Sequence, residues 1–135
     1  GGMVETGTID MLANALMDFT GDDVLFTMII LLVASAVISS VLDNIPFVAT
    51  MIPILLAMEG AGMDVTPLWW ATSLGACLGG NGTLIGASCN VVISDIAAKN
   101  GNPISFVKYM KIGFPLMLLT VLIAGIYLYI VFQPV

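Results

Sequence analysis

Asp43 is the one acidic residue that stands well inside an apolar stretch of this chain, and Asn44 and Pro46 follow it. A carboxylate among apolar residues is costly unless it is paired, hydrated or bound to a cation. The sequence therefore predicts a sodium or proton site at Asp43. The alternative is a carboxylate that caps the helix after it, with Asn44 and Pro46 as turn residues. We favour the ion site, because a cap would not need to stand inside an apolar run.

A cluster of glycines interrupts the next apolar stretch, at positions 75, 79, 80, 82 and 86. Each glycine costs about 1 kcal/mol in a helix interior, so we expect a broken helix over 68–97. Its halves would be 68–78 and 84–97, joined by an unwound segment at 79–83. The alternative reason for the glycines is close helix packing, above all at Gly75 and Gly86.

Polar side chains in and after this glycine cluster offer further oxygen atoms. Asn81 and Thr83 stand beside Gly80 and Gly82, which would let a ligand approach the backbone closely. Ser88 and Asn90 follow on the second half-helix and could either line a cavity or bond a neighbouring helix. Irregular backbone inside a membrane survives only where protein or an aqueous cavity covers it. The predicted break and the Asp43 turn are therefore expected near one depth, as in secondary transporters.

The elements that position these residues are typical of a membrane protein. Of the 135 residues, 59% are hydrophobic and only 9% are charged, whereas soluble domains carry about 25% charged residues. The mean hydropathy is +1.10. Long apolar runs cover 24–42, 45–58, 68–93 and 112–132. We predict an all-α integral membrane protein in which residues 1–135 form one membrane domain.

The composition excludes several classes of function. The formal net charge is −6, with three basic residues in the chain, so nucleic acid would find no basic patch. There is no His, and the two cysteines, Cys77 and Cys89, each stand in an apolar run as expected for small core residues. Zinc binding and nucleophilic catalysis are therefore not expected, and we do not expect an enzyme.

The apolar runs also predict how the chain crosses the membrane. Residues 8–20 form an amphipathic helix that lies at the membrane interface or packs against the protein. The run at 47–58 contains Pro53 and is too short to cross a core of about 30 Å. We therefore expect 24–58 to form a re-entrant helical hairpin that enters and leaves by the same face. Residues 112–132 would form a transmembrane helix.

The charged residues predict the orientation of these elements. All three lysines, Lys99, Lys108 and Lys111, lie in one stretch, which the positive-inside rule places in the cytoplasm. The acidic loops at 22–23 and 59–64 would then lie outside with the C-terminus. We expect the protein in the plasma (inner) membrane.

Two long motifs carry a resemblance to a known family. The stretch DNIPFVATMIP at 43–53, followed by LGACLGGNGTLIGAS at 74–88 and NVV at 90–92, closely resembles the C-terminal repeat of the ion transporter superfamily. Within it, the chain looks most like the group of the pink-eyed-dilution (P) protein and the arsenite-pump membrane subunit. The resemblance implies two inverted repeats, each with a re-entrant hairpin and a broken helix, that usually work as a dimer by an elevator movement.

The resemblance also has implications for the site and for the rest of the protein. In the divalent-anion symporters of this superfamily, a Ser-Asn-Thr motif at the hairpin tip helps to bind sodium and carboxylate. Asp43, Asn44 and Ile45 occupy those three places, and the charge of Asp43 disfavours a dicarboxylate there. Residues 2–7 resemble the end of a preceding family helix. We therefore expect the first repeat to be supplied by a longer protein or by a second chain.

The function expected from the sequence is that of the C-terminal half of a secondary active ion transporter, sodium- or proton-coupled, which moves ions or small anions across the lipid bilayer as a homodimer. Alternatives are an arsenite or dicarboxylate permease and, in another class, a small membrane subunit that transports nothing. No cofactor is expected apart from a bound sodium ion, held by Asp43, Asn44 and Asn81. The expected ion- and substrate-binding residues are Asp43, Asn44, Pro46, Thr50, Gly80, Asn81, Gly82, Thr83, Ser88 and Asn90.

Overall fold

The computed structural model describes residues 7–21 and 23–133, in which every regular element is an α-helix. The expectations for residues 2–6, Asp22 and the last residue, Val135, fall outside the described residues. The helices are α2 (Thr8–Thr20), α3 (Val24–Ser39), α4 (Asn44–Gly60), α5 (Thr66–Gly79), α6 (Ser88–Lys99) and α7 (Phe106–Phe132). We call residues 40–43, between α3 and α4, the hairpin tip, and residues 80–87, between α5 and α6, the break.

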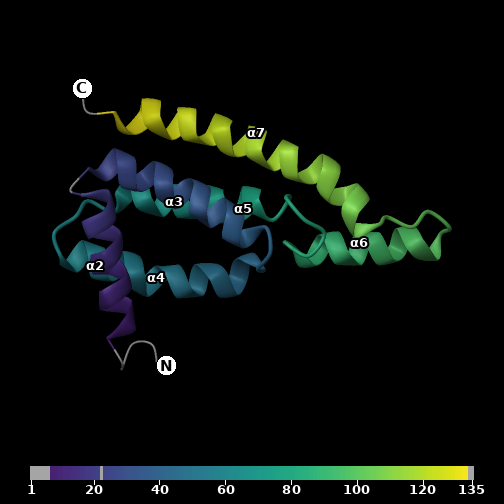
Figure 1. Ribbon diagram of the computed structural model, residues 1–135, viewed down its shortest axis with the longest axis horizontal. Coiled ribbons are helices and arrows are strands. Elements are labelled where there is room, and N and C mark those ends of the chain that lie inside the picture. The colour runs from purple at the N-terminus through teal and green to yellow at the C-terminus, as the bar shows by residue number, and fades with distance from the viewer. Residues whose placement is uncertain (1–6, 22, 134–135) are drawn as a thin grey trace.

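The helices form an elongated bundle with one projecting end (Figure 1). Helices α3 and α5 pack closely together, α4 runs back below them, and α2 crosses the end of the bundle where α4 finishes. Helix α6 extends away from the bundle beyond the break, and the long α7 returns over α3 and α5. This arrangement brings the hairpin tip and the break together in the middle of the molecule.

The lengths of α3 and α4 follow from their caps and from a proline. The Oδ1 atom of Asp23 accepts hydrogen bonds from the backbone N–H groups of Leu25 and Phe26, at 3.0 and 3.3 Å, and begins α3. Helix α3 has 16 residues, about 24 Å, and ends before the expected residue 42. Helix α4 has 17 residues and contains Pro53. Both are shorter than the about 30 Å of a bilayer core, and the re-entrant path of this hairpin stays a prediction.

Helix α7 is the one helix among the described residues that is long and apolar enough to cross a membrane alone. Helices α2 and α3 pass the same test only together, as a pair bent by 118°. In the structure α2 packs on α4 and α3, with Ile9 and Ala13 buried. Met11, Leu12 and Phe19 stay exposed, so the choice between the two expected roles of residues 8–20 stays open.

Two helices begin at residues other than the expected ones. Helix α6 begins at Ser88 and not at residue 84, because the residues before it fold against the hairpin tip. Helix α7 begins at Phe106 and not at residue 112, because the hydroxyl of Ser105 accepts a hydrogen bond from the N–H of Lys108, at 3.3 Å, and caps it. Lys108 and Lys111 therefore lie in the first turns of a helix, whereas the expected helix began after both of them.

Glycine makes the contact between α3 and α5 possible. A Cβ atom on Gly75 would lie 2.5 Å from the carbonyl oxygen of Leu32, and one on Gly79 would collide with the backbone of Ala36. These two glycines are thus explained by close packing, as small residues are in membrane helices. The expectation of buried cysteines is wrong: Cys77 and Cys89 are exposed, because Cys77 lies on the face of α5 opposite to α3 and α6 has no buried residue.

Candidate functional site

The hairpin tip lies directly against the break. The hydroxyl of Thr83 donates a hydrogen bond to the carbonyl oxygen of Ser40, and the hydroxyl of Ser88 donates one to Oδ2 of Asp43. A Cβ atom on Gly86 would lie 2.7 Å from the same Ser40 oxygen. Two segments that the sequence placed at one depth are therefore in contact.

Asp43 caps α4 only weakly. Its Oδ1 atom lies 3.5 Å from the backbone nitrogen of Ile45, at the limit for a hydrogen bond, whereas the cap of Asp23 on Leu25 measures 3.0 Å. An ionised carboxylate has about four acceptor positions on its two oxygens. With one hydrogen bond from Ser88 and one weak cap, Asp43 keeps the capacity to bind a cation.

Two helix N-termini face this carboxylate. Asp43 directly precedes α4, and Ser88 is the first residue of α6. Helix N-termini carry partial positive charge and favour a nearby anion. The residue before α6, Ala87, offers no side-chain acceptor to the first N–H groups of that helix. The site therefore combines one negative side chain with two positive helix ends.

Ser39 orients Asn44 and was not among the predicted site residues. Its hydroxyl is fully buried and lies 2.5 Å from Oδ1 of Asn44 and 2.8 Å from the carbonyl oxygen of Ala76 in α5. One hydroxyl has a single hydrogen and cannot donate to both oxygens. All three groups are satisfied when Ser39 donates to Ala76 and the amide of Asn44, turned over, donates to Ser39. The Asn44 oxygen then no longer accepts from Ser39.

The break is an ordered loop and not an extended segment. Asn90 donates from Nδ2 to the carbonyl oxygens of Gly80 and Thr83, at 2.9 and 3.2 Å. Backbone turns close it further, with the N–H of Gly82 on the carbonyl of Gly79 at 2.8 Å. Ser88 thus contacts the hairpin tip, whereas Asn90 holds the break together, a role that the sequence did not predict.

The glycines of the break act through their small size. Gly80 has ordinary right-handed angles, φ −55° and ψ −20°, and no described glycine between 63 and 100 has positive φ. A Cβ on Gly80 would lie 3.2 Å from the carbonyl oxygen of Gly86, and one on Gly82 would lie 2.6 Å from Sδ of Met117. A larger residue at either position would therefore press on its neighbours.

Two of the predicted site residues lie elsewhere. The exposed Thr50 donates its hydroxyl hydrogen at 2.9 Å to the carbonyl oxygen of Pro46, one turn earlier in α4. Asn81 lines a cavity beside α7, and its carbonyl approaches Gly113 there. Of the predicted sodium ligands, Asp43 and Asn44 therefore lie at the start of α4, whereas Asn81 lies beside α7. Within residues 7–21 and 23–133, no group of three or more His, Cys, Asp or Glu residues could hold a metal ion.

A family profile described as citrate transporter matches residues 1–135, the whole chain. The chain belongs to the citrate transporter family. This citrate transporter family member is 41% identical, over 133 residues, to a 46 kDa membrane protein of Mycobacterium leprae. It is 42% identical to an uncharacterized transporter of Mycobacterium tuberculosis and 52% identical, over 99 residues, to the P protein of Mus musculus. No solved structure matches the chain.

The coverage of these alignments shows how much of each relative the chain represents. It aligns over 96% of its own length with 31% of each of the two mycobacterial proteins, and over 71% with 12% of the mouse P protein. The predicted resemblance to the P protein group is thus confirmed. This citrate transporter family member is an integral membrane protein, and its family is one of transporters.

Proposed function

We propose that this chain is the C-terminal half of a secondary active transporter, and that its coupling cation, sodium or a proton, binds at Asp43. The observation that carries the proposal is the hydrogen bond from Ser88 to Asp43, which joins the start of α6 to the hairpin tip. Helix ends and irregular backbone that meet inside the membrane are the usual ion and substrate sites of such transporters. An inverted first repeat would complete the site, and the whole would move as an elevator within a dimer.

The oxygen atoms around Asp43 suit a hard cation. The carboxylate of Asp43 is used only weakly as a cap, and an Asn44 amide turned over to donate to Ser39 would offer its oxygen to the cation. Unwound backbone carbonyls can add to such a set. Of the predicted sodium ligands, Asp43 and Asn44 are retained in the proposal, and Asn81 is left out because it lies beside α7.

The transported partner of the cation is proposed to be a small carboxylate anion. The uncapped N-terminus of α6 offers N–H donors and positive charge beside the cation position. A cation on Asp43 would neutralise the one negative charge that opposes an anion there. The family description, citrate transporter, agrees with this substrate class. A subunit that transports nothing would have no use for this arrangement, and the family match disfavours it.

The experiment replaces Asp43 with Asn in the intact transporter, reconstituted in liposomes, with Asp23→Asn as the matched control. Both residues precede helices and cap them, and Asn caps a helix as well as Asp does. Loss of the charge is therefore the one change that matters. We expect Asp43→Asn to abolish sodium- or proton-dependent uptake while Asp23→Asn transports normally. Unchanged cation dependence in Asp43→Asn would show that Asp43 is only a helix cap.

A further inference from the structure

A cavity of about 580 Å³ lies between the break and the first half of α7. Lys108 stands at one end of its wall, and Ile112, Leu116 and Thr120 continue along the same side of α7 at intervals of four residues. Twelve residues of helix measure about 18 Å. The cavity thus has a cationic end and a long, largely apolar wall.

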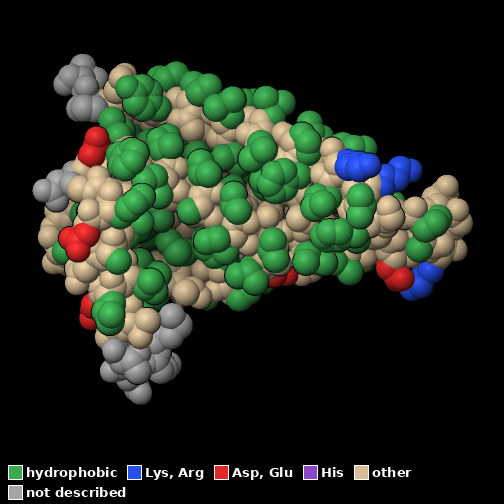
Figure 2. Space-filling model, viewed as in Figure 1, with side chains coloured by type: hydrophobic (Ala, Val, Ile, Leu, Met, Phe, Trp, Pro, Cys, Tyr) green, Lys and Arg blue, Asp and Glu red, His purple; other side chains and the backbone are tan. Residues whose placement is uncertain are grey.

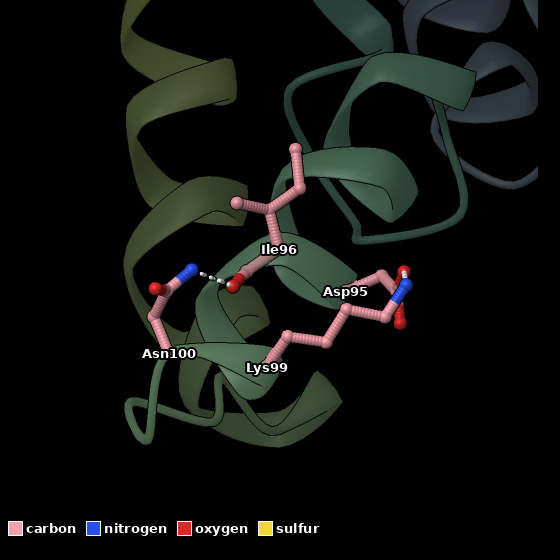
Figure 3. A network of polar contacts seen from close by, with 4 residues as sticks. All are labelled: Asp95, Ile96, Lys99 and Asn100. Atoms are coloured by element: carbon pink, nitrogen blue, oxygen red, sulfur yellow. Dashed lines mark hydrogen bonds and ion pairs between the residues drawn. The ribbon is translucent and has the colours of Figure 1, made fainter.

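The lysine at that end is free to meet an anion. Lys99 forms an ion pair with Asp95, at 2.6 Å, at the C-terminal end of α6, where Asn100 also bonds the carbonyl of Ile96 (Figure 3). This pair is the one salt bridge within the described residues, so Lys108 and Lys111 have no acidic partner there. Figure 2 shows the lysines at the end of the molecule formed by α6 and the start of α7, with most of the visible acidic side chains at the other end.

We propose that this cavity binds an anionic phospholipid, with its phosphate at Lys108 and one acyl chain along Ile112 and Leu116. The wall favours a lipid over a small transported anion. A small anion would need several convergent polar groups, whereas apolar side chains dominate this wall. The length of the wall suits an acyl chain. Tyr109 also lines the cationic end, and an aromatic ring with a polar tip is favoured at the level of lipid head groups.

The position of the cavity in α7 agrees with a lipid ligand. Lys108 lies in the first turn of the one described helix that is long enough to cross a membrane by itself, so its ammonium group belongs at the membrane surface. Basic pockets between membrane helices bind acidic head groups at this level. Asn81 reaches the cavity from the break, so the bound lipid would lie against the back of the candidate site, away from Asp43.

The experiment titrates the purified intact transporter with dioleoyl phosphatidylglycerol or dioleoyl phosphatidylcholine, and counts retained lipids by native mass spectrometry. We expect the transporter to retain phosphatidylglycerol preferentially. Lys108→Gln should weaken its binding about fivefold, since one lysine near an anionic lipid contributes about 1 kcal/mol. Lys99→Gln is the matched control and should bind normally, because Lys99 is already paired with Asp95.

Two further arms separate the lipid from other ligands. Glycerol 1-phosphate carries the phosphate without acyl chains, and we expect it not to compete. Leu116→Trp fills the apolar wall at an exposed position and should also reduce retention of phosphatidylglycerol. Equal retention of both lipids, equal effects of Lys108→Gln and Lys99→Gln, or no retained lipid because another protein segment covers the cavity would each overturn the proposal. None of these results depends on transport, so the cation site at Asp43 is tested separately.

Discussion

The hydroxyl of Ser88, the first residue of α6, donates a hydrogen bond to the carboxylate of Asp43, which lies 45 residues earlier in the chain. The bond crosses from the second half of the broken helix to the tip of the hairpin. The other hydrogen bond of this carboxylate is the weak cap from the N–H of Ile45, at 3.5 Å, so Ser88 is its main anchor among the described residues. The hydrogen bond therefore links the position of the proposed cation ligand to the position of α6.

Removing this anchor should weaken cation binding. In Ser88→Ala we expect the cation concentration for half-maximal uptake to rise about tenfold, because a hydrogen bond to a charged group is lost. The measurement is uptake against sodium concentration and pH in liposomes. Ser94→Ala is the control on the same helix, since Ser94 bonds only the carbonyl of Ile104, at 3.4 Å. If Ser94→Ala and Ser88→Ala change uptake equally, the contact with Asp43 has no special role.

Two buried serines of α3 should differ in their effects. Ser39→Ala breaks the link between Asn44 and Ala76, so we expect weaker cation binding, by about tenfold. Ser35 is equally buried, but its hydroxyl has no hydrogen-bond partner within the described residues. Ser35→Ala should therefore leave cation binding unchanged and slightly raise thermal stability. Both cation titration and thermal unfolding should be measured; weakened cation binding in Ser35→Ala would contradict this reasoning.

The packing of α3 on α5 predicts a large effect of one methyl group. Gly79→Ala would force a Cβ atom into the backbone of Ala36, and overpacking of this kind costs about 1 to 3 kcal/mol. Gly60→Ala adds the same atom where nothing lies within 4 Å. We expect the unfolding temperature in detergent to fall by several degrees for Gly79→Ala and to stay unchanged for Gly60→Ala. Similar stabilities of the two variants would refute the described contact.

The orientation of the chain can be tested with single cysteines. Cys77 and Cys89 must first be replaced, because both are exposed and would react. With a membrane-impermeant maleimide, we expect a cysteine at Asn102 to react from the cytoplasm, and cysteines at positions 22 and 61 to react from outside. Reaction of positions 22 and 61 from opposite sides would exclude a re-entrant hairpin.

Local patterns predicted the elements of the fold better than the contacts between them. The glycine cluster and the turn at Asp43 are signals within a few residues, and the structure has a break and a helix start at these places. The place of Asn81 beside α7 goes with the close approach of its backbone carbonyl to Gly113, a residue of another helix. No local pattern carries that information, so the sequence could not predict the contact between Asn81 and α7.

The type of residue at Ser39 was a signal in the sequence, but its hydrogen-bond partner could not be predicted from it. A pair of hydroxyl residues, Ser39 and Ser40, ends the apolar run just before Asp43, and such residues inside a membrane usually bond to something. The partner of Ser39 is the carbonyl of Ala76, exposed to it because Gly79 and Gly75 let α5 come close. The signal was therefore present in the sequence, while the partner followed from the packing of α3 on α5.

The close contact of α3 with α5 also has a consequence for folding during translation. Helix α3 packs far more extensively on α5 than on α4, its neighbour in sequence. During synthesis α4 leaves the ribosome before Gly75 and Gly79 do, so the nascent hairpin has few contacts of its own until α5 arrives. We therefore expect that pausing of translation just after α4 would prolong the exposure of an incomplete hairpin to proteolysis.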